Sequence, residues 1–493
     1  MRRRAFLTAA AALGSAPSLL LAQSPANLGR LWDLIVVGSG IAGLSAAVSA
    51  AECGAQNVLV VEKLQILGGH SRLSTGSFCG ISPKRMLPFN VHLGVDQVLE
   101  EMLSVGGGLG NRDLCRLLLS QSESAMDWLE SMGVIWNPEP FVSVGSLSAE
   151  SFRSVNGFSG SHYIYKLNAK AREKGVQFLY GQPVTDLLQD HRTGGVNGVV
   201  IKNKNREVVY LRSRAVVLAT GGFTGNPHLC SQLNPSISPR TPSTANPARR
   251  FLDGATGDAL DFTKPFNADT VDLEHIQMIC FLGGRLLDYS GADIYVNSLG
   301  RRFVNESASH GAVRDAILKQ PGKRMWVLTD AKSKKGLSIE DKLAAGSVLK
   351  LPNIEEAAKI VGCAPEALKF TLERYNGFVQ AGRDTDFWKD YLLQTIDTPP
   401  YYVGEEHLGL HYCCGGLKFN AKAQVLNKKG QAIPGLYAAG EVTGGLHGKD
   451  RLGGTGLTEG VVFGRIAGRE AFLFNPHTAS PLAKPEGKDS HFS

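Results

Sequence analysis

Apolar runs separated by glycine-rich turns recur along the chain. The first run, residues 34–37, leads into a turn with the spacing G-x-G-x-x-G and then into small residues that continue to residue 54. A second apolar run, 58–61, follows. Short apolar runs bounded by glycine predict buried strands, and the small residues between them predict a helix that packs closely on those strands. The pattern therefore predicts the strand, helix and strand that begin a parallel α/β sheet.

The three glycines of this turn suit the phosphates of a dinucleotide. Gly38 permits the tight turn, Gly40 lets backbone N–H groups approach a pyrophosphate, and Gly43 lets the helix pack closely on the strand. Glu62 ends the second apolar run, where a carboxylate accepts hydrogen bonds from a ribose. We therefore expect a bound dinucleotide.

A second glycine-rich segment, residues 67–76, follows Glu62 by a few positions. It would lay additional backbone along a bound cofactor, as the ribityl chain and the isoalloxazine ring of FAD require. NAD needs no such segment. The sequence therefore favours FAD over a nicotinamide cofactor.

The next part of the chain alternates helical and strand patterns. Apolar residues at helical spacing predict helices within 95–133, and strand patterns follow at 176–184, 195–201 and 208–211. Residues 215–223 are predicted to form a buried strand that ends in Ala-Thr-Gly-Gly. We interpret this strand as a return to the first sheet.

The composition changes between about residues 273 and 412, where charged helices are predicted at 354–361 and 365–381. Dinucleotide-like motifs are absent from this stretch, and we interpret it as an inserted cap. A third flavin-like segment then ends in Ala-Gly-Glu at Glu441, and a glycine-rich loop enters a helix predicted at 457–472. The N-terminus of that helix would face the pyrimidine edge of the flavin, where negative charge accumulates on reduction.

These patterns predict an α/β fold, in which an FAD-binding Rossmann-like domain is interrupted by an inserted α+β capping domain. A chain of 493 residues exceeds what one hydrophobic core usually serves, which agrees with two domains. The predicted parts are a signal peptide (1–22), the FAD-binding domain in two pieces (31–273 and 412–475), the cap (274–411) and a flexible tail (476–493).

The beginning of the chain predicts export. Arg3 and Arg4, followed by Phe6 and Leu7, fit the twin-arginine pattern, and the apolar run after them is too short for a good membrane span. This route carries folded proteins, so we expect a periplasmic protein without an integral membrane segment. The net charge of +7 is inflated by these first residues, and no basic stripe with aromatics supports nucleic-acid binding.

The eight cysteines give no sign of a metal site. No C-x-x-C pair is present, so no structural zinc is expected, and no C-x-x-C-H motif attaches a c-type haem to this chain. Any cytochrome would be a separate protein. The adjacent Cys413 and Cys414 could be redox active, but packing as small apolar side chains is the favoured interpretation.

Together these motifs resemble the flavoprotein of the soluble fumarate reductase and flavocytochrome c family, which also includes urocanate reductase. The resemblance covers about residues 33–472 and rests on the Gly38 turn with Glu62 and on the segments 68–76, 304–306, 415–416, 438–445 and 451–454. It implies that FAD is bound by the matching residues Ala42, Glu62, His70, Ser71, Thr75, Gly76, Val184, Asp258, Glu441, Gly456 and Leu457. His70 stands where the family usually has asparagine.

The chemistry of the family is reduction of an activated C=C bond, in which reduced flavin N5 gives a hydride to the β-carbon and a side chain protonates the α-carbon. The resemblance implies that Arg451 anchors the substrate carboxylate, which suits a bidentate guanidinium. His310 replaces the family's arginine proton donor, and its unperturbed pKa of about 6.5 would allow proton delivery near neutrality. Alternatively, Arg314 is the donor and His310 only caps a helix starting near Ala312.

Four further positions depart from the fumarate reductase pattern. Ile279 and Tyr412 stand where two histidines are expected, and Leu286 and Tyr289 replace the glutamate and arginine of the proton relay. The clamp for a second carboxylate is therefore largely missing, and an unpaired buried carboxylate is costly. We expect an acrylate-like or arylacrylate-like monocarboxylate, bound by Gly76, His411, Tyr412, Arg451 and Gly454.

The sequence thus predicts a periplasmic FAD-dependent reductase of an α,β-unsaturated carboxylate, with electrons from an external donor such as a c-type cytochrome. Alternatives are fumarate or urocanate reductase proper, a dehydrogenase of the ketosteroid desaturase type with Tyr412 or Tyr289 as base, and a flavoprotein that only transfers electrons. The candidate catalytic residues are His310, Arg451, Arg314 and Tyr412.

Overall fold

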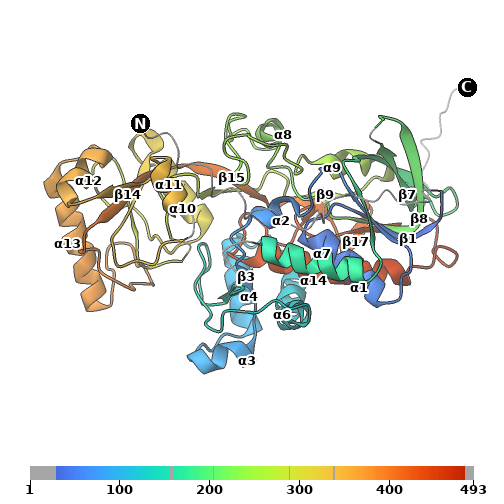
Figure 1. The fold of residues 1–493 in the computed structure, drawn as a ribbon, viewed down its shortest axis with the longest axis horizontal. Coiled ribbons are helices and arrows are strands. Elements are labelled where there is room, and N and C mark those ends of the chain that lie inside the picture. Colours follow the sequence, from blue (N-terminus) through green and yellow to red (C-terminus); the bar gives the residue numbers. More distant parts are fainter. Residues whose placement is uncertain (1–28, 156–159, 204, 288, 337–338, 483–493) are drawn as a thin grey trace, which may run out of the picture.

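The computed structural model describes residues 29–155, 160–203, 205–287, 289–336 and 339–482. The predicted signal peptide, 1–22, lies outside the described residues, as does 483–493 of the predicted tail. In the described ranges, no helix combines the length and the apolar character needed to cross a membrane. The molecule is elongated, with a sheet and its helices at one end and a smaller unit at the other (Figure 1).

The apolar runs of the sequence form the centre of one large sheet. β1 (Trp32–Val37) pairs in parallel with β2 (Val58–Glu62) on one side and with β8 (Val208–Leu218) on the other. The order across the sheet is β17, β18, β8, β1, β2, β5, and β6 joins through β7 to β8. The outer strands are β5 (Gln177–Tyr180), β6 (Val184–Gln189), β7 (Val196–Lys202), β17 (Gln424–Leu426) and β18 (Ala432–Ala438).

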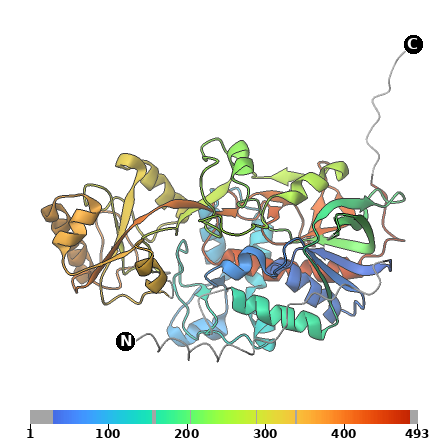
Figure 2. The same cartoon turned by 45° about the horizontal axis from the view of Figure 1, so that its top comes forward.

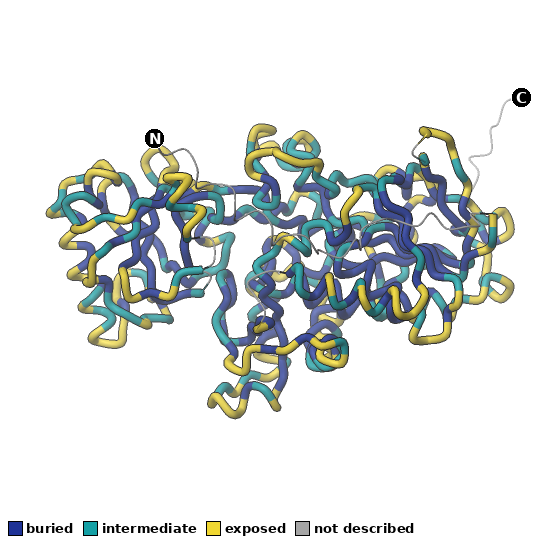
Figure 3. Tube along the Cα trace, in the orientation of Figure 1, coloured by how far each residue is buried: buried dark blue, intermediate teal, exposed yellow. Residues whose placement is uncertain are grey.

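Alternate side chains of β1 point to two separate cores. Leu34 and Val36 pack with α1 (Ile41–Glu52), α7 (Ser161–Glu173) and α14 (Thr455–Leu473). Ile35 and Val37 pack on the opposite face, with residues of β6 and β7. The central strands are therefore buried on both faces, as the continuous dark colour of this region in Figure 3 shows.

Small residues allow α1 and α14 to lie in close contact. A Cβ added to Gly468 would lie 2.1 Å from the carbonyl oxygen of Ala46, and one added to Gly464 would lie 2.6 Å from that of Ala42. These distances leave no room for a larger side chain. The run of alanine, glycine and serine in α1 thus brings α1 and α14 together on one face of the sheet.

A second group of helices lies beside this sheet. The predicted helical stretch 95–133 is confirmed as α4 (Val95–Val105), α5 (Arg112–Ser120) and α6 (Ser122–Ser131). The other short elements of this part are α2 (Gly69–Leu73), β3 (Phe78–Cys79), α3 (Pro83–Met86), β4 (Ser151–Phe152), α8 (Pro227–Leu233), α9 (Asp258–Phe262), β9 (Thr270–Val271), β16 (Gly416–Lys418) and β19 (Thr443–Gly444).

The cap is built on an antiparallel sheet of four strands in the order β11, β12, β14, β13. Helices α12 and α13 pack on one face of it and α10 packs on the other. A ladder of β10 with β15 leads from the cap to the large sheet (Figures 1 and 2). The elements are β10 (Ile276–Cys280), β11 (Ile294–Val296), α10 (His310–Leu318), β12 (Met325–Thr329), α11 (Ile339–Ala344), β13 (Leu349–Leu351), α12 (Ile354–Val361), α13 (Pro365–Ala381), β14 (Tyr401–Glu406) and β15 (Leu408–Cys413).

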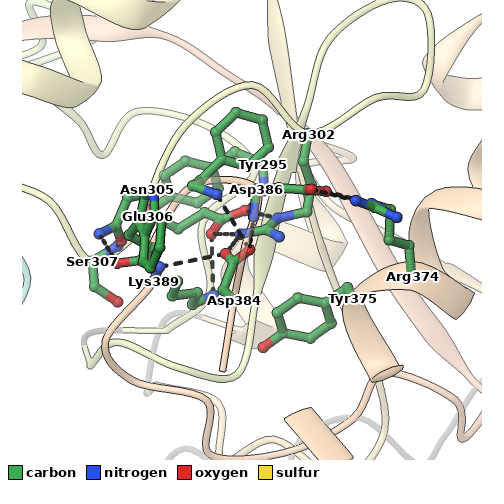
Figure 4. A network of polar contacts seen from close by, with 12 residues as sticks. Tyr295, Arg302, Asn305, Glu306, Ser307, Arg374, Tyr375, Asp384, Asp386 and Lys389 are labelled. Atoms are coloured by element: carbon green, nitrogen blue, oxygen red, sulfur yellow. Dashed lines mark hydrogen bonds and ion pairs between the residues drawn. The ribbon is translucent and has the colours of Figure 1, made fainter. Parts of the chain in front are cut away.

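A buried ionic network holds the segment that leads into α10. Arg302 donates from Nε to Glu306 at 2.7 Å and from Nη2 to Asp384 at 2.8 Å. Lys389 lies 3.3 Å from the other oxygen of Glu306. Figure 4 shows these side chains converging inside the cap. Because every charge has an opposite partner, the network fixes the backbone of 302–306 just before the helix that carries His310.

The structure corrects three predicted boundaries. The strand predicted at 176–184 is two strands, β5 and β6, because Gly181 between them has a φ of +66°. The strands predicted at 208–211 and 215–223 are joined in β8, whose first half pairs with β7 and whose second half pairs with β1 and β18. Helix α10 begins at His310 and not near Ala312. The helices predicted at 354–361 and 365–381 are confirmed to the residue.

Candidate functional site

One elongated cavity runs from the first turn of the large sheet to the cap. Its lining includes nearly all the residues that the sequence assigns to cofactor binding: Gly38, Gly40, Ala42, Glu62, His70, Ser71, Thr75, Gly76, Val184, Asp258, Glu441, Gly456 and Leu457. Its far end is lined by the predicted substrate residues His310, His411, Tyr412, Arg451 and Gly454. The fold therefore brings both predicted sets into one continuous space.

The glycine turn has the geometry that a phosphate cradle needs. Gly38 has a φ of +103°, and a Cβ on it would lie 2.2 Å from the carbonyl oxygen of Ala219. A Cβ on Gly43 would lie 2.0 Å from the carbonyl oxygen of Gly38, which explains its role in packing although it lies behind the cavity wall. Gly40 is the N-cap of α1 and has no side chain of its own to cap the helix, while the Ser71 hydroxyl accepts a hydrogen bond from the N–H of Ile41 at 3.2 Å. The partial positive charge of this helix end favours an anion.

Glu62 is fixed at the end of β2, beside this turn. One oxygen of its carboxylate accepts hydrogen bonds from the Ser39 hydroxyl at 2.7 Å and the Ser39 N–H at 3.1 Å. The other oxygen accepts from the N–H of Leu64 at 2.8 Å. These three hydrogen bonds fix the orientation of the carboxylate at the cavity, as a ribose contact requires.

His70 forms an ion pair that the sequence analysis did not find. Its Nε2 lies 2.7 Å from Oδ1 of Asp253, which is 183 residues away in the chain. Burial alone would lower the pKa of His70, but the hydrogen bond to Asp253 and the charge of Glu441 raise it above its ordinary value. The histidine in the family's asparagine position therefore favours a positive charge on the cavity wall.

The cavity has unpaired polar groups where a cofactor would contact it. The hydroxyl oxygen of Thr220 is buried, lines the cavity and has no hydrogen-bond partner among the described residues. Thr220 follows β8 and belongs to the Ala-Thr-Gly-Gly turn that the sequence analysis marked as a second approach to a dinucleotide. With the Gly38 cradle and Glu62, this wall fits a dinucleotide such as FAD.

Arg451 is held at the far end of the cavity by β10. Its Nη2 donates to Gln277 at 3.2 Å and its Nη1 donates to the carbonyl of Leu452 at 2.9 Å. The amide of Gln277 also donates to Asp450 at 2.6 Å, which fixes the loop itself. The Nε of Arg451 is buried and has no partner among the described residues. A buried guanidinium with an unused donor is prepared to receive an anion.

Tyr412 lies next to this guanidinium, and its hydroxyl is already engaged. The hydroxyl donates to Glu459 at 2.5 Å, and Nε2 of His447 lies 2.8 Å from the same carboxylate oxygen. Burial and the charge of Glu459 raise the pKa of Tyr412 well above its ordinary value. The sequence analysis missed Glu459, although a lone carboxylate one turn into a helix of small residues, α14, was a signal for it.

His310 lies against the loop that precedes β4. A Cβ on Gly145 would lie 2.3 Å from Nε2 of His310, so this close approach requires glycine. Burial and the positive charges of Arg451 and Arg285 lower the pKa of His310 to about 3, against the effect of a hydrogen bond with the Val144 backbone. Burial and these two neighbouring cations thus hold the pKa of His310 well below its unperturbed value of about 6.5.

The structure also places the two residues of the alternative, His310 as a helix cap and Arg314 as the proton donor. Ser309 is the N-cap of α10 and accepts from the N–H of Ala312, so His310 is the first helical residue and not the cap. Arg314 lies outside the set of described residues that line the cavity, and its Nε donates to Asp315 at 2.9 Å. His411, by contrast, lines the cavity and has its Nδ1 2.8 Å from the Thr244 hydroxyl.

No group of three or more His, Cys, Asp or Glu side chains in the described part of the chain is arranged to hold a metal ion. Cys413 and Cys414 are buried and free, and the Sγ of Cys413 accepts a hydrogen bond from the N–H of Phe223 at 3.1 Å. These cysteines therefore pack beneath the site.

The chain is similar to known proteins over most of its length. The FAD binding domain family matches residues 33–457. The fumarate reductase (cytochrome) of Shewanella frigidimarina is 32% identical over 450 residues, which are 90% of this chain and 77% of that protein. The acrylate reductase flavoprotein subunit of Shewanella woodyi is 28% identical over 493 residues, which are 94% of this chain and 96% of that subunit. The open conformation of a flavocytochrome c3 fumarate reductase has a TM-score of 0.69 at 31% identity, covering 90% of this chain and 78% of that one.

Proposed function

The chain belongs to the family of FAD-dependent oxidoreductases that includes the soluble fumarate reductases, and from this premise we propose that it reduces the C=C bond of an α,β-unsaturated monocarboxylate. The observation that carries the proposal is the lining of the far end of the cavity. There Arg451 lies over the ring of Tyr412 and shares the lining with Ile279, Phe281, His310 and His411. One guanidinium suits one carboxylate, and the apolar side chains suit an apolar or aromatic substituent.

Arg451 is the anchor in this proposal. Its free Nε and its remaining Nη hydrogens would bind the substrate carboxylate, while Gln277 and the Leu452 carbonyl keep the guanidinium in place. The positive charge also stabilises negative charge that develops on the carboxylate side of the double bond. When bound, FAD supplies the hydride for the other carbon.

His310 is the proton donor in this proposal. Without a substrate carboxylate nearby it would be neutral, because burial and the charges of Arg451 and Arg285 lower its pKa to about 3. A bound carboxylate offsets the charge of Arg451, so its arrival raises the pKa of His310 and favours uptake of a proton. Protonation would then be coupled to substrate binding, and the relay positions Leu286 and Tyr289 would not be needed.

The geometry of Tyr412 speaks against this residue as the base of a desaturase. A tyrosine base must lose its proton, but the Tyr412 hydroxyl donates to Glu459 and its pKa is raised. A second negative charge beside the Glu459 carboxylate would be strongly disfavoured. The ring of Tyr412 therefore serves as an apolar wall.

We extend the proposal to compartment and electron source. Arg3 and Arg4 would direct the folded flavoprotein to the periplasm, where an external donor such as a c-type cytochrome would reduce it. Replacing both arginines by lysine should retain the precursor in the cytoplasm, as measured by fractionation and immunoblotting. Normal export of this variant would exclude the twin-arginine route.

The function is tested with the purified flavoprotein and reduced methyl viologen as an artificial donor. The acceptors are acrylate, cinnamate, fumarate, urocanate and a 3-ketosteroid. We expect oxidation of the dye with acrylate or cinnamate above the rate with fumarate. Preference for fumarate or urocanate would contradict the monocarboxylate assignment, and turnover with none of the acids would contradict the reductase itself.

A further inference from the structure

A basic and apolar surface projects from the loop that follows α8, which lies at the upper edge of the molecule in Figure 1. We call residues 247–252 the RRFL tip, after Arg249, Arg250, Phe251 and Leu252. All six residues of the tip are exposed. Leu252 is 82% exposed and Phe251 is 48% exposed. Adjacent large apolar side chains exposed to this degree, with two arginines beside them, suggest a binding surface.

The residues on either side of the RRFL tip hold its backbone by hydrogen bonds. The buried side chain of Asn246 donates from Nδ2 to the carbonyl of Phe251 at 2.7 Å and accepts from the N–H of Arg250 at 2.9 Å. Immediately after the tip, Asp253 accepts from the Ala255 N–H at 3.0 Å and pairs with His70. The exposed side chains are thus presented by a clamped loop, which lowers the entropy cost of binding a partner.

The base of the same loop forms part of the cofactor cavity. Thr244 and Ala245 precede the tip and line the cavity, and Gly254 and Ala255 follow the tip and line it too. His70, the partner of Asp253, is also in the lining. A protein bound at the tip would therefore lie over this part of the cavity wall.

We propose that the RRFL tip is the docking surface for an acidic electron-transfer protein, a c-type cytochrome by chemical class, that reduces the bound flavin. This inference rests on the proposed function, in which electrons come from outside the chain. Each ferrous haem gives one electron and becomes ferric. Two docking events supply two electrons, which with two protons from solvent convert one C=C bond into a CH–CH bond.

The chemistry of the tip agrees with such a partner. Arg249 and Arg250 would steer an acidic surface and pair with its carboxylates, so association should weaken as salt screens the charges. Phe251 and Leu252 would give the small apolar centre that arginine and aromatic residues commonly form in transient interfaces. The Asp253 carboxylate does not oppose the arginines, because it is paired with His70.

The test uses the holoenzyme and a purified acidic c-type cytochrome. Binding of the ferric cytochrome is measured by biolayer interferometry at low and high salt, and flavin reduction by the ferrous cytochrome is followed by stopped flow. The variants are Arg249→Glu with Arg250→Glu, and Leu252→Ser. The matched control is Lys428→Glu with Lys429→Glu, a charge reversal at exposed residues of the β17–β18 turn.

We expect the double arginine variant to bind at least tenfold more weakly and to lose most of the salt dependence, and Leu252→Ser to bind several-fold more weakly. The lysine control should match the unmodified protein within twofold, and reduction by methyl viologen should be unchanged in all variants. Equal binding by the arginine variant and the lysine control would overturn the proposal, as would absence of cytochrome binding to the unmodified protein. Failure of the proposed function would appear separately, as lack of acid reduction with methyl viologen.

Discussion

The guanidinium carbon of Arg451 lies 4.6 Å from the centre of the Tyr412 ring. The arginine is thereby placed between an aromatic face and Gln277, which leaves its Nε free at the cavity. This stacking explains how one substitution in the family pattern changes two properties at once. In the proposed site, Tyr412 stands where the family resemblance implies a histidine that could pair with a second carboxylate, and its ring supports the arginine proposed to bind the first.

The proposed role of Arg451 predicts that substrate binding weakens when its guanidinium group is removed. In Arg451→Gln, two hydrogen bonds to a carboxylate are lost, each worth about 1.5–3 kcal/mol, so kcat/KM should fall at least about 10²-fold. Arg451→Lys should recover only part of this loss, because an ammonium cannot bind the carboxylate bidentately. Steady-state kinetics with reduced methyl viologen measure kcat/KM for both variants. A lysine variant with full activity would show that charge alone is required.

The assignment of the proton donor predicts a difference between two neighbouring side chains. His310→Gln should slow single-turnover oxidation of the reduced flavin by about 10²–10⁴-fold, the usual contribution of general acid catalysis. Arg314→Gln, which lies outside the cavity lining, is the control and should change the rate less than twofold. A loss below tenfold in the histidine variant would remove His310 from the role, and a large loss in the control would transfer the role to Arg314.

Glu62 should contribute to FAD affinity through the adenosine ribose. Removing one charge-assisted hydrogen bond in Glu62→Ala costs about 1.5–3 kcal/mol, which raises the dissociation constant of FAD roughly 10- to 150-fold. Titration of the apoprotein with FAD, followed by fluorescence, measures this dissociation constant. Glu366→Ala, at an exposed position in the first turn of α13, is the matched control and should bind FAD normally. An unchanged affinity in Glu62→Ala would contradict the ribose contact.

Glu150 predicts a particular pH dependence of stability. It is fully buried in the loop before β4, and burial raises its pKa to about 8, although the Ser146 hydroxyl opposes this shift. Between about pH 4.3 and 8 the folded protein holds a proton on Glu150 that the unfolded chain releases. The free energy of unfolding therefore loses up to about 1.4 kcal/mol per pH unit as the pH rises through this window.

Glu150→Gln should remove this contribution. Urea unfolding at pH 5, 6 and 7 should show a smaller decline in the free energy of unfolding for the variant than for the unmodified protein. Glu366→Gln, at an exposed residue, should leave the decline as it is. Parallel curves for Glu150→Gln and the unmodified protein would mean that Glu150 is ionised in the folded state.

Local patterns predicted the nucleotide-binding half of the fold well. The glycine turn at Gly38 and the helix after it follow from residues adjacent in the sequence, and the structure confirms strand, turn and helix there. The continuity of β8 was missed because the polar residues 212–214 resemble a break between strands. The strand β8 accommodates residues 212–214 because its partner changes there, from β7 to β1 and β18.

The electrostatics of the site could not be predicted from residue types. The pairing of His70 with Asp253 depends on a loop that returns to the cavity after 183 residues. The low pKa of His310 depends on Arg451 and Arg285, which the fold brings to it from two other segments. Sequence motifs identified His70 and His310 as candidates, but burial and neighbours distant in the sequence shift the pKa values of both histidines.

The most direct test of the monocarboxylate assignment is the ratio of kcat/KM for acrylate to kcat/KM for fumarate, measured with methyl viologen in the unmodified protein and in Ile279→His with Tyr412→His. Ile279 and Tyr412, which stand in the lining where the family resemblance implies histidines, predict a ratio above ten in the unmodified protein and a decrease of at least tenfold in the double variant. A ratio at or below one in the unmodified protein would contradict the assignment.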